Sequence, residues 1–270
     1  MAFARVQGVG GSATTQNLTV TLPAGTTINN LVVVGVTLTA AGSSDSVTDT
    51  ASQTYALAIG AFGVTNEVNL WYGVQTGGGV TAITSNLDAS RLQQVIAEEF
   101  SGGATSNAAI IGLTSSGTAD ASTSASVTSF TPTTGSLVCA FIRTTVVPNF
   151  SVSAPIVLGA TTNRSGMIHR LSASGAETMP ATLDSGNWRE VAAEFKVGTI
   201  AYTLPITTGS YAITGNAIGL NAAFQVPVTT GSYAITGNDI DLVVVVVPAG
   251  GGTGQYSGFF PVPDYIRRRQ

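Results

Sequence analysis

Short runs rich in Val, Ile, Thr and aromatic residues recur along the whole chain, and Gly, Pro, Asn and Ser separate them. LVVVGVTLTA, which begins at Leu31, and NEVNLWYGVQTGGG, which begins at Asn66, are two such runs. This spacing is typical of a β-sandwich or β-barrel, and no stretch has the periodicity of an amphipathic helix of any length. The sequence therefore predicts an all-β protein.

The segment from Ser126 to Lys196 repeats the order of motifs in the segment before it. GNWREVAAEF, which ends at Phe195, answers RLQQVIAEEF, which ends at Phe100. GMIHRLSASGA likewise answers VNLWYGVQTGGG, which aligns His169 with Trp71. With about four strands in each half, residues 1–198 are predicted to form one duplicated sandwich of about eight strands, the size of a jelly roll.

The alternation of apolar and polar residues in these runs indicates which faces are buried. LVVVGV is apolar on both faces, so we expect it at the centre of a sheet or beneath a neighbouring surface. LQQVIAEEF carries polar residues on both faces. Cys139 stands alone in the apolar run SLVCAFI, where we expect a buried small side chain rather than a reactive thiol.

Three of these motifs, NLVVVGV, NLWYGV with its Gly-rich turn and the closing AEEFSG, give residues 1–198 a resemblance to known modules. The segment resembles the concanavalin A-like and jelly-roll modules of bacterial surface proteins and tailed-phage structural proteins. The resemblance implies a jelly-roll or β-sandwich body.

The ten residues TTGSYAITGN occur twice without a substitution, from Thr207 and again from Thr229. Each copy is predicted to form a β-hairpin around a Gly-Asn turn, with four apolar side chains on one side. Residues 199–248 would then be two 22-residue hairpin repeats. The apolar residues expected to mediate oligomerisation are Tyr211, Ile213, Ile218, Leu220, Tyr233, Ile235, Ile240 and Leu242.

Two hairpins are too few to bury their own apolar faces, because hairpin repeats need roughly three or more stacked units. We therefore expect these faces to pack on neighbouring subunits or on a larger assembly. The units also resemble a repeat with the core T-G-x-[YF]-x-[IL]-T-G-x, found in tandem in tailed-phage virion proteins. This second resemblance implies a virion structural protein.

Residues 249–270 begin with the flexible joint AGGGTGQ and end with YSGFFPVPDYIRRRQ. Three arginines against Asp264 give the part from Gln255 onward a formal charge of +2, whereas the whole chain carries -4. This composition predicts a docking arm for an acidic surface, although a frayed tail remains the alternative. Its expected anchors are Phe259, Phe260, Tyr265, Arg267, Arg268 and Arg269.

Few residues of this chain can carry ionic chemistry. Only 9% of them are charged, against roughly 25% in typical soluble domains, and Lys196 and His169 are the only lysine and histidine. Multi-histidine metal sites and lysine clusters are thus excluded within one chain. The net charge gives no general attraction to nucleic acid or to anionic membranes. The start has no leader-like apolar core, and the longest apolar run, LVVVVVP, is too short to cross a bilayer.

Candidate catalytic groups are equally sparse. His169 is the only possible base for a serine triad, but its strand context favours a packed residue. Glu98 and Glu99 are adjacent in a strand, so they point to opposite faces. Glu99 and Glu194 could pair across a groove, or each could close its strand at an equivalent rim position. We expect no enzymatic activity and no cofactor.

Two weaker binding hypotheses remain. Asp45 and Asp49 in SSDSVTDT could supply oxygen ligands to calcium, or could cap turns instead. Trp71 and Tyr72 could contact a glycan, although large aromatic residues in strands, Trp188 included, more often pack in a core.

These observations together favour a structural protein of a tailed-phage virion, assembled in the host cytoplasm. Within that class we expect a head decoration or fibre protein that attaches through its C-terminal region. The expected partners are copies of the same chain, as a trimer by analogy, and other virion proteins, without nucleic acid or membrane. The alternative is a glycan-binding adhesion module of a tail fibre or baseplate, which would bind a host surface glycan.

Overall fold

The computed structural model describes residues 2–39, 45–53, 55–62, 66–198, 211–215, 225–228, 233–237 and 245–248. The chain divides into two compact units, Met1–Gly198 and Thr199–Gln270. This division coincides with the boundary drawn from the sequence. The first unit, Met1–Gly198, is the body of the protein.

The first half of the body supplies six strands. They are β1 (Ala4–Thr21), β2 (Leu31–Thr39), β3 (Asp45–Asp49), β4 (Ala56–Phe62), β5 (Asn66–Val74) and β6 (Ala82–Ser101). The second half contains one short helix, α1 (Asn107–Ile110), and five strands. These are β7 (Ile111–Ala125), β8 (Leu137–Thr144), β9 (Val157–Thr161), β10 (Ser165–Arg170) and β11 (Ala181–Phe195). The body is thus a nearly all-β structure, as predicted.

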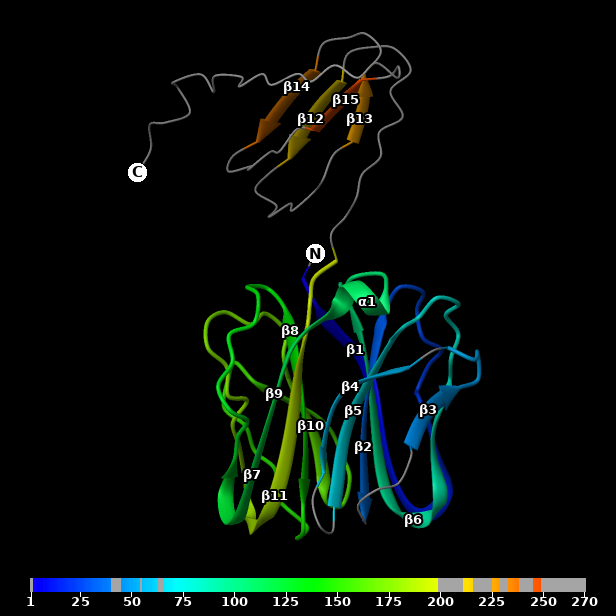
Figure 1. Cartoon of the computed structure of the whole chain (residues 1–270), viewed down its shortest axis with the longest axis vertical. Helices are drawn as coiled ribbons and strands as arrows, with labels where there is room; N and C mark the ends of the chain where they lie inside the picture. The colour runs from blue at the N-terminus through cyan, green and yellow to red at the C-terminus, as the bar shows by residue number, and fades with distance from the viewer. Residues whose placement is uncertain are drawn as a thin grey trace. The chain divides into compact units, whose positions relative to one another are not determined.

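Each half of the body forms one antiparallel sheet, and the two sheets repeat the same strand order. The first sheet runs β1-β6-β2-β5-β4, with β3 paired to β6, and the second runs β7-β11-β8-β10-β9. Figure 1 shows the blue and cyan strands of the first sheet beside the green and yellow strands of the second. The internal duplication therefore holds at the level of topology.

The topology corrects two details of the expected body. The chain completes one sheet before it starts the other, whereas a jelly roll builds its two sheets from strands that cross between them. Among the described residues the body also has eleven strands rather than eight. A β-sandwich of two packed sheets describes it, and the jelly-roll strand order does not.

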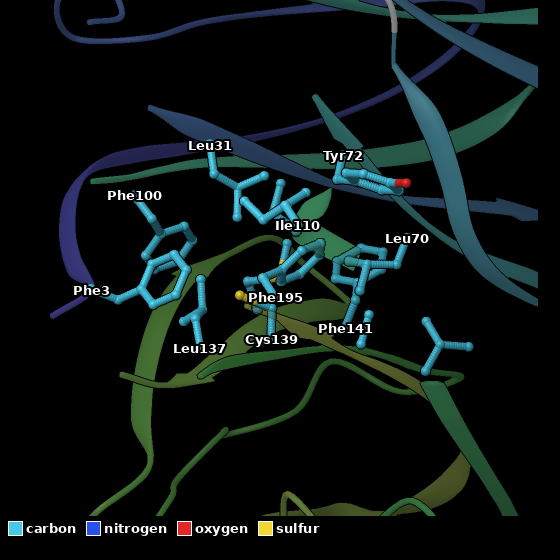
Figure 2. Close-up of a cluster of buried hydrophobic side chains, with 14 of the residues drawn as sticks. Phe3, Leu31, Leu70, Tyr72, Phe100, Ile110, Leu137, Cys139, Phe141 and Phe195 are labelled. Carbon is cyan, nitrogen blue, oxygen red and sulfur yellow. The ribbon is translucent and has the colours of Figure 1, made fainter. Parts of the chain in front are cut away.

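The main core lies between the two sheets. It contains residues from both halves, and Figure 2 shows their side chains converging from the two layers. Those labelled there are Phe3, Leu31, Leu70, Tyr72, Phe100, Ile110, Leu137, Cys139, Phe141 and Phe195. Cys139 is fully buried, as the sequence predicted.

The two sheets are in close contact where Phe141 of β8 packs over Gly35 of β2. A Cβ atom added to Gly35 would lie closer than 3.0 Å to carbons of the Phe141 ring. Glycine inside a strand often marks such a close approach. The glycine of LVVVGV thus has a packing role that the sequence did not reveal.

Apolar layers also cover the outer faces of both sheets. On the first sheet, Val34 and Val36 of β2 pack with Val20 of β1 and Ile83 of β6. The β1-β6 ladder changes register between Thr15 and Asn17, and such bulges bend a strand pair. The far end of the ladder can therefore fold over its own sheet. This explains why LVVVGV is buried on both faces, as expected.

The C-terminal unit contains four described strands. They are β12 (Tyr211–Gly215), β13 (Gln225–Val228), β14 (Tyr233–Gly237) and β15 (Val245–Pro248). β12 pairs with β14 and β13 pairs with β15, and both pairs are parallel. These strands are two separate two-stranded sheets among the described residues.

Candidate functional site

The described strands of the two repeat copies, β12 and β14, lie side by side in register. Tyr211 is opposite Tyr233 and Ile213 is opposite Ile235, in parallel strands. A parallel pair between equivalent strands of successive repeats is the arrangement of stacked repeat units. The repeat period of 22 residues therefore sets the strand register of this segment.

The other parts of the expected attachment surface lie outside the described residues. This holds for Ile218, Leu220, Ile240 and Leu242, and for the arm residues Phe259, Phe260, Tyr265, Arg267, Arg268 and Arg269. The segment that would follow each Gly-Asn turn is among them. The hairpin within each repeat stays a prediction.

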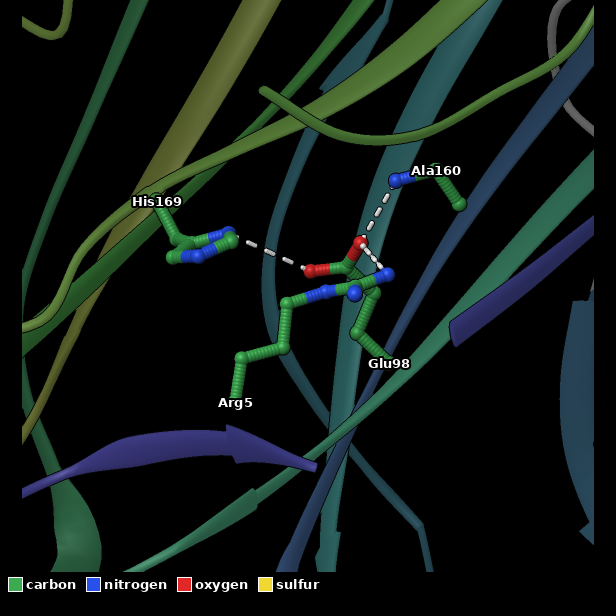
Figure 3. Close-up of polar contacts among 4 residues, drawn as sticks. All are labelled: Arg5, Glu98, Ala160 and His169. Carbon is green, nitrogen blue, oxygen red and sulfur yellow. Dashed lines mark hydrogen bonds and ion pairs between the residues drawn. The ribbon is translucent and has the colours of Figure 1, made fainter. Parts of the chain in front are cut away.

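A polar cluster around the buried Glu98 lies at one edge of the space between the two sheets. Glu98 of β6 accepts hydrogen bonds from the guanidinium of Arg5 at 3.1 Å and from the backbone N–H of Ala160 at 2.6 Å. Its other carboxylate oxygen lies 3.3 Å from Nδ1 of His169 on β10. Figure 3 shows all three partners around this one carboxylate.

Glycines make room for the Glu98 side chain. A Cβ atom on Gly159 of β9 would collide with its carboxylate, and one on Gly8 of β1 would touch its Cγ. Glu98 is fully buried and His169 is 1% exposed. This cluster joins the first sheet to β9 and β10 of the second, so it is a polar link between layers.

At the opposite edge of the sandwich, the equivalent positions form an aromatic contact instead of a charged cluster. His169 lies opposite Cys139 of β8, and Tyr72 lies opposite Val33 of β2. Because β8 and β2 are the equivalent central strands of the two sheets, His169 and Tyr72 occupy equivalent places. His169 packs edge-on against Phe100 with ring centres 5.2 Å apart, and Tyr72 packs against Phe195 at 5.6 Å. The alignment of His169 with Trp71 was therefore wrong by one residue, although a packed His169 is confirmed.

Glu99 and Glu194 hold equivalent loops, one in each half. Glu99 accepts hydrogen bonds from the backbone N–H of Thr27 at 2.8 Å and from the Asn30 amide at 2.6 Å. Glu194 accepts them from the N–H of Thr133 at 2.7 Å and from other donors near it. Each carboxylate thus fixes the loop before its central strand.

Glu99 and Glu194 cannot form a catalytic pair with each other. Along their strands they alternate with Phe100 and Phe195, which point into the space between the sheets. The two carboxylates therefore lie on opposite outer faces of the sandwich. The alternative prediction, that each glutamate closes its own strand at an equivalent position, is confirmed.

Hydrogen bonds lower the pKa of Glu194 below its usual value even though the group is buried. Burial alone would raise this pKa. The N–H groups of Leu113 and Thr133 and the hydroxyl of Ser136 favour the ionised form and outweigh that effect. Glu194 is therefore an ionised structural group at neutral pH.

The two aromatic residues considered for glycan contact differ in their surroundings. Tyr72 is 6% exposed, points into the main core in Figure 2 and donates a hydrogen bond to the Asn107 carbonyl. Trp71 is half-buried and packs against the outer apolar layer of the first sheet. Tyr72 thus offers no free ring face to a sugar.

The structure gives Asp49 a turn-capping role. Its Oδ1 accepts hydrogen bonds from the N–H groups of Ala51 at 2.9 Å and Gln53 at 3.0 Å. Asp45 starts the same strand, opposite Leu87. Among the described residues no three His, Cys, Asp or Glu side chains gather as metal ligands would.

Sequence reasoning missed Arg5 and Glu98 as partners because they are 93 positions apart. The available signal was a Glu between Ile96 and Phe100 on one strand face. A buried carboxylate of this kind requires a cation or several donors.

The chain matches no protein-family model, no curated protein and no solved structure. Within the part of the chain that the structure describes, no helix has the length and apolar character needed to span a bilayer.

Proposed function

We propose that the chain is a structural component of a tailed-phage virion, and within that class a head decoration or fibre protein. Residues 199–270 attach it to the particle and to other copies of itself. The observation that carries this proposal is the verbatim repeat, whose copies pair in parallel and in register within a unit separate from the body.

Each of the two C-terminal sheets has only two strands among the described residues. Two-stranded sheets are marginally stable in water, so further strands from neighbouring subunits would stabilise them. The body needs no such help, because its two sheets share an apolar core. On this proposal the β-sandwich body faces outward and has no catalytic activity, and the C-terminal unit forms the oligomer.

Co-sedimentation with virions of the phage that encodes the chain tests the attachment. The full chain should sediment with the particles, and a version that ends at Gly198 should stay in the supernatant. Separated heads and tails then distinguish a head protein from a tail-fibre or baseplate protein. If the full chain bound neither, the virion proposal would fail.

A further inference from the structure

In each half of the body, the far end of one strand pair folds over the outer face of its own sheet. A change of register in each pair lets it bend in this way. We call these ends the first arm and the second arm. The first arm comprises residues 17–21 of β1 and 82–86 of β6, and the second comprises residues 120–128, from β7 and the loop after it, and 181–187 of β11.

Equivalent glycines leave space beneath the two arms. A Cβ atom on Gly11 of β1 would collide with the side chain of Val20 in the first arm. One on Gly117 of β7 would collide with the backbone oxygen of Ser126 in the second arm. Each arm therefore lies directly on its sheet at this point.

The residue paired with this glycine differs between the halves. Gly11 lies opposite Val95 of β6, whereas Gly117 lies opposite Glu190 of β11. Val95 is an ordinary member of an apolar layer. Glu190 is fully buried, and neither of its carboxylate oxygens has a hydrogen-bond partner among the described residues. Because an unpaired charge is very costly in such a place, the closed second arm covers a protonated carboxyl group.

The sheet beneath the second arm supplies no charge that could replace this proton. The residues of β8 and β9 on this face are uncharged, as are those of β7 beside Gly117. Glu194, four residues farther along β11, is held by backbone N–H groups of β7 and of the loop before β8. Arg170 of β10 pairs with Glu177.

The remaining charged groups point elsewhere. Arg143, Arg189 and His169 lie on the other face of their strands, toward the space between the sheets. The second arm itself carries Asp120 and Asp184, and both are exposed. An ionised Glu190 can therefore be stabilised only by water, which reaches it when the second arm lifts from the sheet.

We propose that ionisation of Glu190 opens the second arm, so that this arm, unlike the first, is a pH-sensitive element of the body. The closed arm holds the neutral acid, and opening releases its proton to solvent and hydrates the carboxylate. Local opening of this kind leaves the main core between the sheets in place. The proposal does not depend on how the chain is attached to a particle.

The direction of the pH effect follows from the burial of Glu190. Burial raises its pKa in the closed state, whereas in the open state it titrates near about pH 4.3. The closed arm is therefore most stable below that pH. The open population should rise up to about tenfold per pH unit above it, until the pH reaches the raised pKa of the closed state.

Hydrogen exchange of the full chain between pH 5 and pH 8, resolved by peptide, tests the proposal. Protection factors, which are corrected for the intrinsic effect of pH on exchange, should fall with pH in the second arm, by up to about tenfold per unit. Those of the first arm should change little. The two arms are compared by their slopes with pH, because β3 also pairs with the first arm and adds to its protection.

Two variants connect the effect to one carboxyl group. Glu190→Val, which introduces the residue of the first half, should remove the pH dependence from the second arm. Asp120→Asn, which changes an exposed carboxylate of the same arm, should leave it unchanged. Melting temperatures at pH 5 establish that both variants are folded.

Three results would overturn the proposal. The first is protection of the second arm that does not change with pH. The second is an equal loss in both arms, which would mean that the whole body unfolds. The third is a pH dependence that persists in Glu190→Val, which would assign the effect to another group.

Discussion

Glu190 is a fully buried carboxyl group on the outer face of the second sheet. It lies opposite Ile142 of β8 and Gly117 of β7, and neither of its carboxylate oxygens has a hydrogen-bond partner among the described residues. Burial raises its pKa well above the usual value. Val95 holds the equivalent place in the first half, so the position belongs to an apolar layer.

Replacing Glu190 by Gln should remove a pH-dependent loss of stability. The folded protein keeps this carboxyl protonated while the unfolded chain ionises it above about pH 4.3, so wild-type stability falls as pH rises. Relative to Glu190→Gln the wild type should lose up to about 1.4 kcal/mol per pH unit above that value, until the pH reaches the raised pKa of the folded protein. Urea unfolding at pH 5, 6 and 7 measures this. If the stabilities of the wild type and of Glu190→Gln changed equally with pH, this prediction would be contradicted.

Adding one methyl group at Gly35 should destabilise the body. The new Cβ would collide with the Phe141 ring, and overpacking of this kind costs about 1–3 kcal/mol. The double variant Gly35→Ala/Phe141→Leu should lose less than the sum of the two single changes. Gly77→Ala, where the added atom meets only an ordinary contact, is the control. If the double variant lost as much stability as the two single variants together, the collision between the new Cβ and the Phe141 ring would be ruled out.

At the scale of elements, the loops before the two central strands depend on one carboxylate each. Glu194 holds its loop through donors at Thr133 and Ser136, and its pKa is lowered in the folded state. A lowered folded pKa stabilises the protein above the unfolded value, and this contribution is lost as pH falls through the folded value.

Glu194→Gln should therefore destabilise the protein by about 2 kcal/mol at pH 7, because hydrogen bonds to a charged acceptor are the stronger ones. The deficit should shrink as the pH falls below about 4.3, where the unfolded wild-type chain binds the proton, and be smallest once the folded carboxyl is protonated as well. Thermal unfolding across pH 2.5–7 follows the difference. A deficit that is independent of pH would mean that the charge of Glu194 contributes nothing.

The elements were easier to predict than their register. Val32 and Val34 mark a fully buried strand because the local pattern is apolar on both faces. The alignment of the two halves failed at β10, where a shift of one residue exchanges Trp71 for Tyr72 as the counterpart of His169. Such a shift exchanges the two faces of a strand, and short motifs do not fix it.

At the scale of the whole molecule, the Glu98 cluster is a polar connection between the two halves. Glu98→Gln should cost about 1.5–3 kcal/mol, because it removes the charge from a buried acceptor that is bonded to the partly exposed Arg5 guanidinium and lies beside the buried His169. Arg91→Gln, which breaks the ion pair between Arg91 and Asp88, should cost at most about 1 kcal/mol. Chemical denaturation measures the stability of both variants. If Glu98→Gln and Arg91→Gln lost equal stability, the Glu98 cluster would stabilise the protein no more than an exposed ion pair does.

The strand order of the body could not be predicted from the sequence. The spacing of strands gave the all-β class, and the AEEF and AAEF endings gave the duplication. Whether a duplicated half builds one sheet or contributes to both depends on contacts between distant residues, such as Gly35 with Phe141.

On the proposed function, residues 199–270 assemble the protein and the body does not. Light scattering of the full chain beside a version that ends at Gly198 measures both masses in solution. We predict an oligomer, a trimer by analogy, for the full chain, and a folded monomer for the shorter one. Two monomers, or a shorter version that still assembles, would contradict the claim.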